Sequence, residues 1–203
     1  MSQKTLIGIA GGIGSGKSVV ARMLRATGRK VYDCDSEARR LMNDDDTLRR
    51  QLSEAFGNDI YGSDGMLDRK RLAALVFTDS DNLQRINALV HPAVGRDIAR
   101  WTAEQSDTTL WVETAILRES GLDSIVDRAW LVEAPLEVRI ERAMRRDGTT
   151  RDKVLERIES QRCDKPYHCP TDFITNDGLS ALTPQIAVLT RRAENIIDSE
   201  NEI

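Results

Sequence analysis

A glycine-rich segment near the start of the chain constrains the fold more than any other feature. Residues 8–24 read GIAGGIGSGKSVVARML, and residues 11–18 match the pattern G-x-x-x-x-G-K-[ST]. The apolar run Thr5–Ala10 precedes the pattern, and apolar residues at helical spacing follow it up to Gly28. This order predicts a strand, a phosphate-binding loop and a helix, because glycines let main-chain N–H groups curl around an anion without obstruction by Cβ atoms.

The loop is expected to bind a nucleoside triphosphate. The start of the following helix adds unpaired amides and the positive end of a dipole. Lys17 is expected to reach the β- and γ-phosphates, and the Ser18 hydroxyl to bind Mg²⁺. The alternative is a glycine-rich turn that binds nothing, and the flanking strand and helix argue against it. The residues expected to contact ATP are Gly12, Ile13, Gly14, Ser15, Gly16, Lys17, Ser18 and Val19.

Short apolar runs alternate with helical patterns along the rest of the chain. The runs are Thr5–Ala10, Lys30–Asp35, Thr109–Leu117, Arg128–Pro135 and Asp172–Asp177. Strands that alternate with helices predict an α/β fold, here a five-stranded parallel sheet flanked by helices.

The long helical stretch at about 36–106 contains no clear strand. It predicts an insertion that binds the second substrate, so that a single domain has a core of residues 1–35 and 107–203. Pro92 lies inside a helical pattern in this insertion and is expected to kink or interrupt it.

Composition narrows the class of protein. The 203 residues carry a net charge of −4, which argues against a general binder of nucleic acids or membrane surfaces. There is neither a run of 18 apolar residues nor the pattern of a signal peptide.

The odd count of three cysteines fits a reduced, cytoplasmic protein. Cys163, His168 and Cys169 lack the fourth ligand and the spacing of a zinc site. We expect a monomer or weak homo-oligomer that acts on small molecules.

Two acids follow the second apolar run, in VYDCDSEARRL. Asp33 and Asp35 are expected near the carboxyl end of a parallel strand, where the sites of open α/β sheets form. A carboxylate there can accept the proton of an attacking hydroxyl or help to hold a metal. If the chain turns at Cys34, one acid enters the site and the other caps the next helix. A capping role for both acids is the remaining alternative.

The ordered set of motifs resembles the dephospho-coenzyme A kinase family. GGIGSGKS and VYDCDSEAR are similar to that family's TGGIGSGKS and DxDxxAR, and the FG pair, GMLDRKRL, INALVHP, AILRE and EVRIERAMRRDG resemble further segments in the right order. DFITNDG is similar to its ADxxxxNxG.

The chain contains no N-K-x-D motif, which a GTPase would use to recognise guanine. The motif at Asp59–Gly62, D-x-x-G, does not follow a strand.

The resemblance implies phosphorylation of the 3′-hydroxyl of dephospho-coenzyme A, with ATP as co-substrate and Mg²⁺ as cofactor. Asp35 would be the catalytic base and Asp33 would support it. Lys17 would keep its catalytic role at the phosphates. Arg142 and Arg146, on a lid at about 139–165, would clamp the transferred phosphoryl group, with Arg146 also contacting ATP.

The acceptor would be bound mainly by the helical insertion. The resemblance assigns this role to Asp33, Phe56, Leu67, Arg69, Asn87, His91, Pro92 and Glu119. Ala115, Thr171 and the stretch 162–171 depart from the family pattern and leave individual contacts open. Two other functions remain as alternatives: a P-loop kinase for a nucleoside, nucleotide or sugar acid, and a regulatory module that binds nucleotide without transferring phosphate.

Several other residues have two interpretations. Arg139 and Arg145 are expected on a solvated basic face of the lid helix. Glu113 is either a carboxylate that positions the metal through water or a surface acid at a strand end. Trp111 and Trp130, together with Trp101, are expected in the core or lining a groove.

Overall fold

The computed structural model describes residues 4–77, 79–161 and 166–200. The chain divides into two compact units. The first, here called the sheet unit, consists of Met1–Tyr32 and Ser106–Ile203. The second, here called the helical unit, is Asp33–Gln105.

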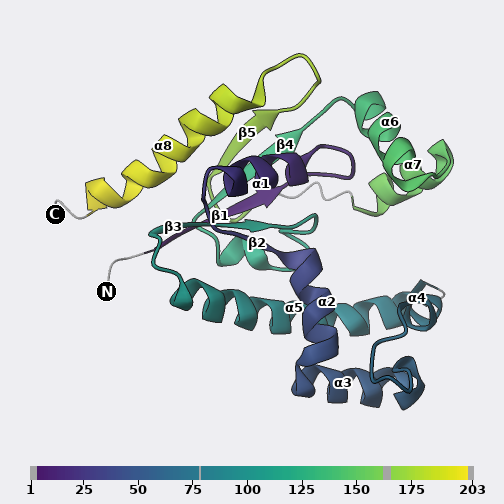
Figure 1. Cartoon of the computed structure of the whole chain (residues 1–203). Helices are drawn as coiled ribbons and strands as arrows, with labels where there is room; N and C mark the ends of the chain where they lie inside the picture. The colour runs from purple at the N-terminus through teal and green to yellow at the C-terminus, as the bar shows by residue number, and fades with distance from the viewer. Residues whose placement is uncertain (1–3, 78, 162–165, 201–203) are drawn as a thin grey trace. The chain divides into compact units, whose positions relative to one another are not determined.

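The sheet is the five-stranded parallel sheet that the alternating pattern predicts (Figure 1). Its strand order is β2-β3-β1-β4-β5. The strands are β1 (Thr5–Ala10), β2 (Val31–Asp33), β3 (Thr109–Glu113), β4 (Arg128–Glu133) and β5 (Thr171–Thr175). The strand β1 lies at the centre, so the loop that follows it leaves from the middle of the carboxyl edge.

Four strands differ from their predicted ends. The second ends at Asp33 instead of Asp35, because a helix starts at Cys34. The third ends at Glu113, and the segment after it folds into turns and the 3₁₀ helix η2 (Leu122–Ser124). The fourth along the chain, β4, ends at Glu133 instead of Pro135. The fifth begins at Thr171 and ends at Thr175.

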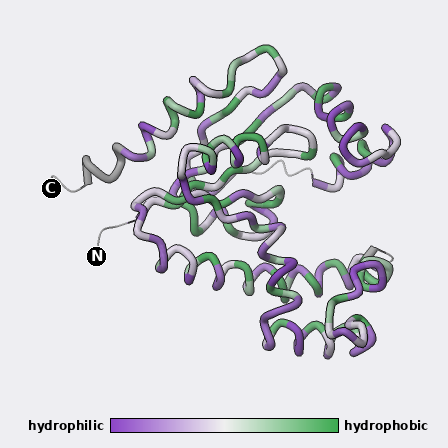
Figure 2. Tube along the Cα trace, in the orientation of Figure 1, coloured by the Kyte–Doolittle hydropathy of each residue, from purple (hydrophilic) through white to green (hydrophobic). Residues whose placement is uncertain are grey.

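One face of the sheet is covered by α1 (Lys17–Ala26) and α8 (Leu182–Glu200). The core beneath them contains Trp111 and Trp130, which confirms the prediction for these two residues. Their rings meet edge to face with centroids 6.0 Å apart. The green, apolar stretches of trace in Figure 2 include these strands. The sheet unit also holds α6 (Leu136–Asp147) and α7 (Arg151–Ser160), which pack on each other.

The described residues of the helical unit form four helices and a short 3₁₀ turn. These are α2 (Cys34–Asp44), α3 (Asp46–Phe56), η1 (Asn58–Ile60), α4 (Arg69–Phe77) and α5 (Ser80–Glu104). The helix α5 continues through Pro92, so the prolyl ring does not interrupt it. Its buried residues Ala93, Val94 and Ile98 hold it in the unit's core, and this packing outweighs the backbone hydrogen bond that proline removes.

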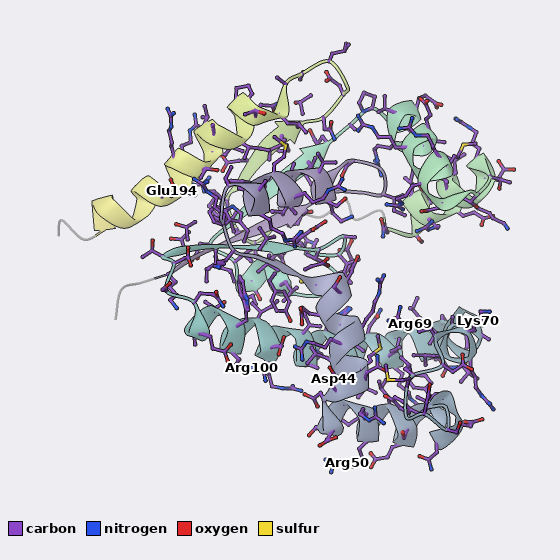
Figure 3. All side chains as sticks on the ribbon, viewed as in Figure 1. Asp44, Arg50, Arg69, Lys70, Arg100 and Glu194 are labelled. Atoms are coloured by element: carbon purple, nitrogen blue, oxygen red, sulfur yellow. The ribbon has the colours of Figure 1, made fainter. Side chains whose placement is uncertain are left out.

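Buried charge in this unit is paired. The carboxylate of Asp97 on α5 accepts a hydrogen bond from Arg40 on α2 at 2.9 Å and is also paired with Arg100. Figure 3 shows Arg100 on α5, together with Arg69 and Lys70 at the exposed start of α4. No helix among the described residues is long and apolar enough to cross a membrane.

Candidate active site

The glycine-rich loop lies between β1 and α1, as the sequence pattern predicts. Gly14 has φ +75° and Gly16 has φ +95°, which are conformations that side chains disfavour. A Cβ atom on Gly14 would lie 2.2 Å from the carbonyl oxygen of Arg139, and one on Gly16 would lie 2.1 Å from Nδ2 of Asn176. Glycine is therefore required at both positions by the backbone conformation and by the close neighbours.

Several main-chain N–H groups of the loop are left free to bind an anion. The N–H of Ser15 donates to the Gly12 carbonyl at 3.1 Å, and that of Val19 to Gly16 at 2.9 Å. Within the described part of the sheet unit, no main-chain acceptor takes up the N–H groups of Gly14, Gly16, Lys17 and Ser18. The first turn of α1 contains no acidic residue, so its positive dipole end is uncompensated.

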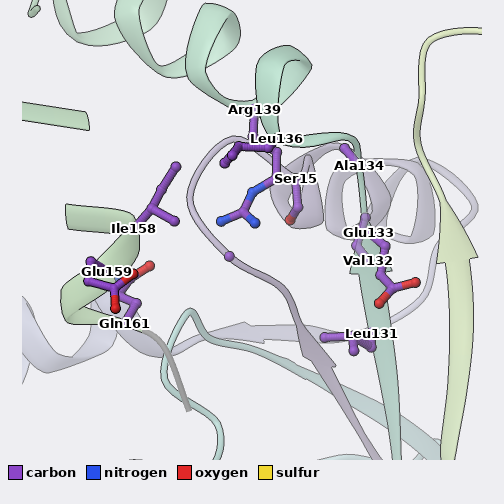
Figure 4. A pocket seen from close by; sticks show the side chains of 11 residues that line it. Ser15, Leu131, Val132, Glu133, Ala134, Leu136, Arg139, Ile158, Glu159 and Gln161 are labelled. Carbon is purple, nitrogen blue, oxygen red and sulfur yellow. The ribbon is translucent and has the colours of Figure 1, made fainter. Parts of the chain in front are cut away.

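Ser15 adds a polar group without a partner. Its side chain is 1% exposed, and no described residue hydrogen-bonds its Oγ atom. Ser15 and Gly12 line a cavity of about 490 Å³ at the carboxyl end of β4 (Figure 4). A buried hydroxyl without a partner is costly. The other lining residues are Leu131, Val132, Glu133, Ala134, Leu136, Arg139, Ile158, Glu159 and Gln161.

Arg139 contradicts its prediction. It is half-buried on α6, lines the cavity and points toward the loop in Figure 4, whereas a solvated position was expected. Its Nε atom donates a hydrogen bond to the Ile13 carbonyl at 2.9 Å, and burial lowers the pKa of its guanidinium. Arg145 is exposed, as predicted. Linear spacing does not separate the two, since only the packing of the first turn of α6 against the loop brings Arg139 inward.

Arg142 contacts Asn176, which in turn donates a hydrogen bond to the phosphate loop. Its Nη1 atom donates to the main-chain oxygen of Asn176 at 2.9 Å. Asn176 is 8% exposed, and its Nδ2 atom donates to the Ser15 carbonyl at 2.7 Å. Asn176 has no predicted role from sequence; the signals that could have marked it are its place just after a strand and its position within the motif DFITNDG.

Arg146, unlike Arg139 and Arg142, pairs with an acid at the end of its own helix. Its Nε atom forms an ion pair with Asp147 at 2.6 Å, and Asp147 also pairs with Arg157 of α7 at 2.7 Å. The hydrogen bond to Asp147 raises the pKa of Arg146, and the bonds from Arg146 and Arg157 hold the pKa of Asp147 well below its usual range. Thr150 occupies the N-cap position of α7 without a side-chain hydrogen bond.

The two acids after β2 have different surroundings. Asp33 is the N-cap of α2: its Oδ1 accepts from the Ser36 N–H at 3.1 Å and its Oδ2 from the Ser36 hydroxyl at 2.9 Å. Asp35 is exposed in the first turn of α2. The chain thus turns at Cys34, and one of the two acids, Asp33, caps the next helix. The alternative in which both acids are caps is wrong, because Asp35 lies inside the first turn.

Glu113 is buried at the end of β3, opposite Ile9 in register, so the interpretation as a surface acid is wrong. Its carboxylate lies 3.9 Å from Nη1 of Arg25. Among the described residues, no three His, Cys, Asp or Glu side chains gather as metal ligands. Cys163 lies outside the described residues.

The helical unit contains most of the residues predicted to bind the acceptor. Phe56 ends α3, and Leu67 is buried where it pairs with Tyr61 in an antiparallel bridge. Arg69 is exposed as the first residue of α4 (Figure 3). These residues come from three neighbouring segments of one unit.

The remaining predicted acceptor residues are divided between the units. Asn87 and His91 are both half-buried on α5, four residues apart and so on one side of the helix. Burial lowers the pKa of His91. Pro92 is exposed beside them, and Glu119 is exposed in the turns after β3, in the sheet unit.

Comparison with known proteins identifies the family. The family model of dephospho-CoA kinases matches residues 5–181. A dephospho-CoA kinase of Porphyromonas gingivalis is 43% identical over 155 residues, 76% of each chain. One of Bacteroides fragilis is 38% identical over 185 residues, 90% of each chain.

Solved structures share the fold. The crystal structure of TT1252 from Thermus thermophilus is similar with a TM-score of 0.75 at 34% identity, over 95% of this chain and 98% of that one. A dephospho-CoA kinase from Campylobacter jejuni has the same fold, with a TM-score of 0.66 at 18% identity, over 98% and 100% of the two chains. The phosphate loop, the five-stranded sheet and these matches together show that the chain belongs to the dephospho-CoA kinase family.

Proposed function

We propose that this chain transfers the γ-phosphoryl group of ATP to the 3′-hydroxyl of dephospho-coenzyme A, the last step of coenzyme A synthesis. The observation that carries the proposal is the phosphate loop with its free N–H groups, in a chain that matches the dephospho-CoA kinase family over residues 5–181. The loop accounts for the triphosphate, and the family accounts for the acceptor.

The loop and Lys17 bind the phosphates of ATP in this proposal. The free N–H groups and the dipole of α1 bind phosphate oxygens, and the Lys17 ammonium compensates charge on the β- and γ-phosphates. Mg²⁺, the expected cofactor, would supply charge neutralisation at the phosphate oxygens of ATP. The Ser18 hydroxyl and, through water, the buried Glu113 carboxylate are the oxygen donors that suit this hard cation.

Phosphoryl transfer needs positioning and charge stabilisation more than covalent chemistry. In the proposal the exposed Asp35 carboxylate orients the 3′-hydroxyl and accepts its proton as the oxygen attacks the γ-phosphorus. Arg142 and Arg146 stabilise the charge on the transferred group. The helical unit binds the remainder of the acceptor through the residues that the family resemblance assigns.

The cellular setting is part of the same proposal. A net charge of −4 supports small-molecule substrates without a nucleic-acid partner. The cytoplasmic location is proposed because the three cysteines fit a reducing compartment. The proposal also takes the protein to be a monomer or a weak homo-oligomer.

A panel of acceptors tests the proposal. The protein is incubated with ATP, Mg²⁺ and one of four acceptors: dephospho-coenzyme A, a nucleoside, a nucleoside monophosphate or a sugar acid. The expected product is coenzyme A, from dephospho-coenzyme A alone. Faster turnover of another acceptor would assign the chain to a different kinase activity, and nucleotide binding without any turnover would favour a regulatory module. The Asp35→Asn variant, purified in parallel, detects a contaminating kinase because its activity should be at least ~10²-fold lower.

A further inference from the structure

We infer that Arg139 and Asn176 are positioning residues that hold two peptide groups of the phosphate loop, so that the N–H groups of Gly14 and Gly16 face the phosphates of the nucleotide. The inference deepens the proposed function and rests on it for the identity of the anion. It concerns how the loop is oriented before the nucleotide arrives.

Peptide geometry connects the observed hydrogen bonds to the free N–H groups. In a planar trans peptide the carbonyl of one residue and the N–H of the next point in opposite directions. The Ile13 carbonyl accepts from Nε of Arg139 at 2.9 Å, so the N–H of Gly14 points away from Arg139. The Ser15 carbonyl accepts from Nδ2 of Asn176 at 2.7 Å, so the N–H of Gly16 points away from Asn176.

Both hydrogen bonds are shielded from water. The bond between Asn176 and Ser15 is buried, and that between Arg139 and Ile13 is partly buried. The guanidinium of Arg139 also lies against Gly12, where an added Cβ would come within 2.2 Å of Nη2. Shielded bonds to groups with little room to move resist peptide rotation more than bonds at a wet surface do.

The orientation of the Asn176 amide is itself determined by its neighbours. Arg142 donates from Nη1 to the main-chain oxygen of Asn176 at 2.9 Å and from Nη2 to its Oδ1 at 3.5 Å. Because a guanidinium only donates, the amide oxygen faces Arg142 and the amide nitrogen faces Ser15. The Asn176 N–H donates to the Glu133 carbonyl at 2.8 Å, which fixes the main chain as well.

The two contacts give the loop a function that its own sequence lacks. Glycine peptides rotate readily, and a free loop would lose binding energy by ordering its N–H groups around each incoming phosphate. Donors that are already oriented stabilise developing charge without that reorganisation. Arg139 and Asn176 therefore act through the loop, without a role in the proton transfer itself.

Binding of ADP to the intact protein tests this inference, because it needs no acceptor. Arg139→Met removes the donor and keeps most of the side chain, and Asn176→Ala removes the other donor. Each change leaves a carbonyl without its partner, so each should weaken ADP binding by about 5- to 100-fold in an equilibrium titration. Arg139→Lys should recover part of the loss. Arg145→Met, an exposed arginine on the same helix, is the matched control and should bind ADP like the wild type.

Amide resonances give a second readout that loss of stability alone would not change. In ¹⁵N–¹H spectra, Arg139→Met should perturb chiefly the Gly14 amide and reduce its shift on ADP addition, whereas Asn176→Ala should do so at Gly16. Wild-type ADP affinity within about twofold, with normal shifts of both glycine amides, would overturn the inference. If Asn176→Ala does not fold, Arg139→Met decides alone. A failure to phosphorylate dephospho-coenzyme A would refute the proposed function and leave this test standing.

Discussion

Asp33 and Asp35 lie two residues apart, and a small set of substitutions separates the role of a helix cap from that of a catalytic base. Asp33 accepts two hydrogen bonds from Ser36 at the start of α2, at 3.1 and 2.9 Å. Asp35 is exposed, and within the described part of the helical unit its carboxylate forms no hydrogen bond or ion pair. The prediction is that changes at Asp33 act mainly on stability and changes at Asp35 mainly on the chemical step.

The structure sets the size of each effect. Asp33→Ala removes an N-cap, which costs about 1 kcal/mol of unfolding free energy, within a range of about 0.5–2 kcal/mol. Asp33→Asn should stay within a few tenths of that of the wild type, because asparagine caps as well as aspartate. Asp35→Asn removes a favourable charge near the helix start and should cost at most ~1 kcal/mol. Its kcat should fall at least ~10²-fold, because the amide cannot accept the hydroxyl proton.

Two measurements on each variant complete the test. Urea unfolding followed by circular dichroism gives the stability, and initial rates at saturating ATP and dephospho-coenzyme A give kcat. A near-normal kcat for Asp35→Asn, in a protein as stable as the wild type, would refute its role as the base. Equal stability of Asp33→Ala and Asp33→Asn would refute the argument from capping. A low kcat for Asp33→Asn at unchanged stability would show that the charge of Asp33 also supports the reaction.

Three further predictions concern the loop and the two helices α6 and α7. Lys17→Ala should lower kcat at least ~10²-fold and weaken ATP in an equilibrium titration, and unchanged ATP affinity would contradict its place at the phosphates. Gly14→Ala forces an L residue to φ +75° and places its Cβ atom 2.2 Å from a main-chain oxygen of α6. The variant should therefore lose at least ~1 kcal/mol of unfolding free energy and most of its ADP binding, and wild-type behaviour in urea unfolding would contradict this. Hydrogen bonds from Arg146 and Arg157 lower the pKa of Asp147 in the folded protein. Its ionised carboxylate therefore contributes fully to folding stability above the unfolded pKa of about 4, and this contribution is lost as pH falls from there through the folded pKa. Asp147→Asn should therefore reduce the acid-induced loss of stability in urea unfolding, and an unchanged acid limb would contradict the pairing.

The phosphate loop and the sheet were predictable because their signals are local. The glycines of the loop, Lys17 and Ser18 all lie in one short segment. The apolar runs mark the strands, and their alternation with helices predicts that the strands are parallel. The turn after β2 was only half predictable. The sequence allows a cap at either Asp33 or Asp35, and the hydrogen bonds of Ser36 decide for Asp33.

Other features depend on contacts between distant parts of the chain. Proline normally breaks a helix, yet α5 passes through Pro92 because packing in the helical unit favours the longer helix. Arg139 and Arg145 look alike in sequence, but folding leaves Arg139 half-buried and Arg145 exposed. Glu113 has two interpretations from sequence, and only its burial at the end of β3 excludes a surface acid.

The sequence by itself determined that a strand, a glycine loop and a helix form a phosphate site within an α/β sheet. Only the tertiary structure decided which side chains hold that loop. Arg139 reaches Ile13 across 126 residues and Asn176 reaches Ser15 across 161. Local spacing reports which backbone conformations a segment can adopt, whereas the orientation of a peptide group depends on partners that only the folded chain brings within hydrogen-bond distance.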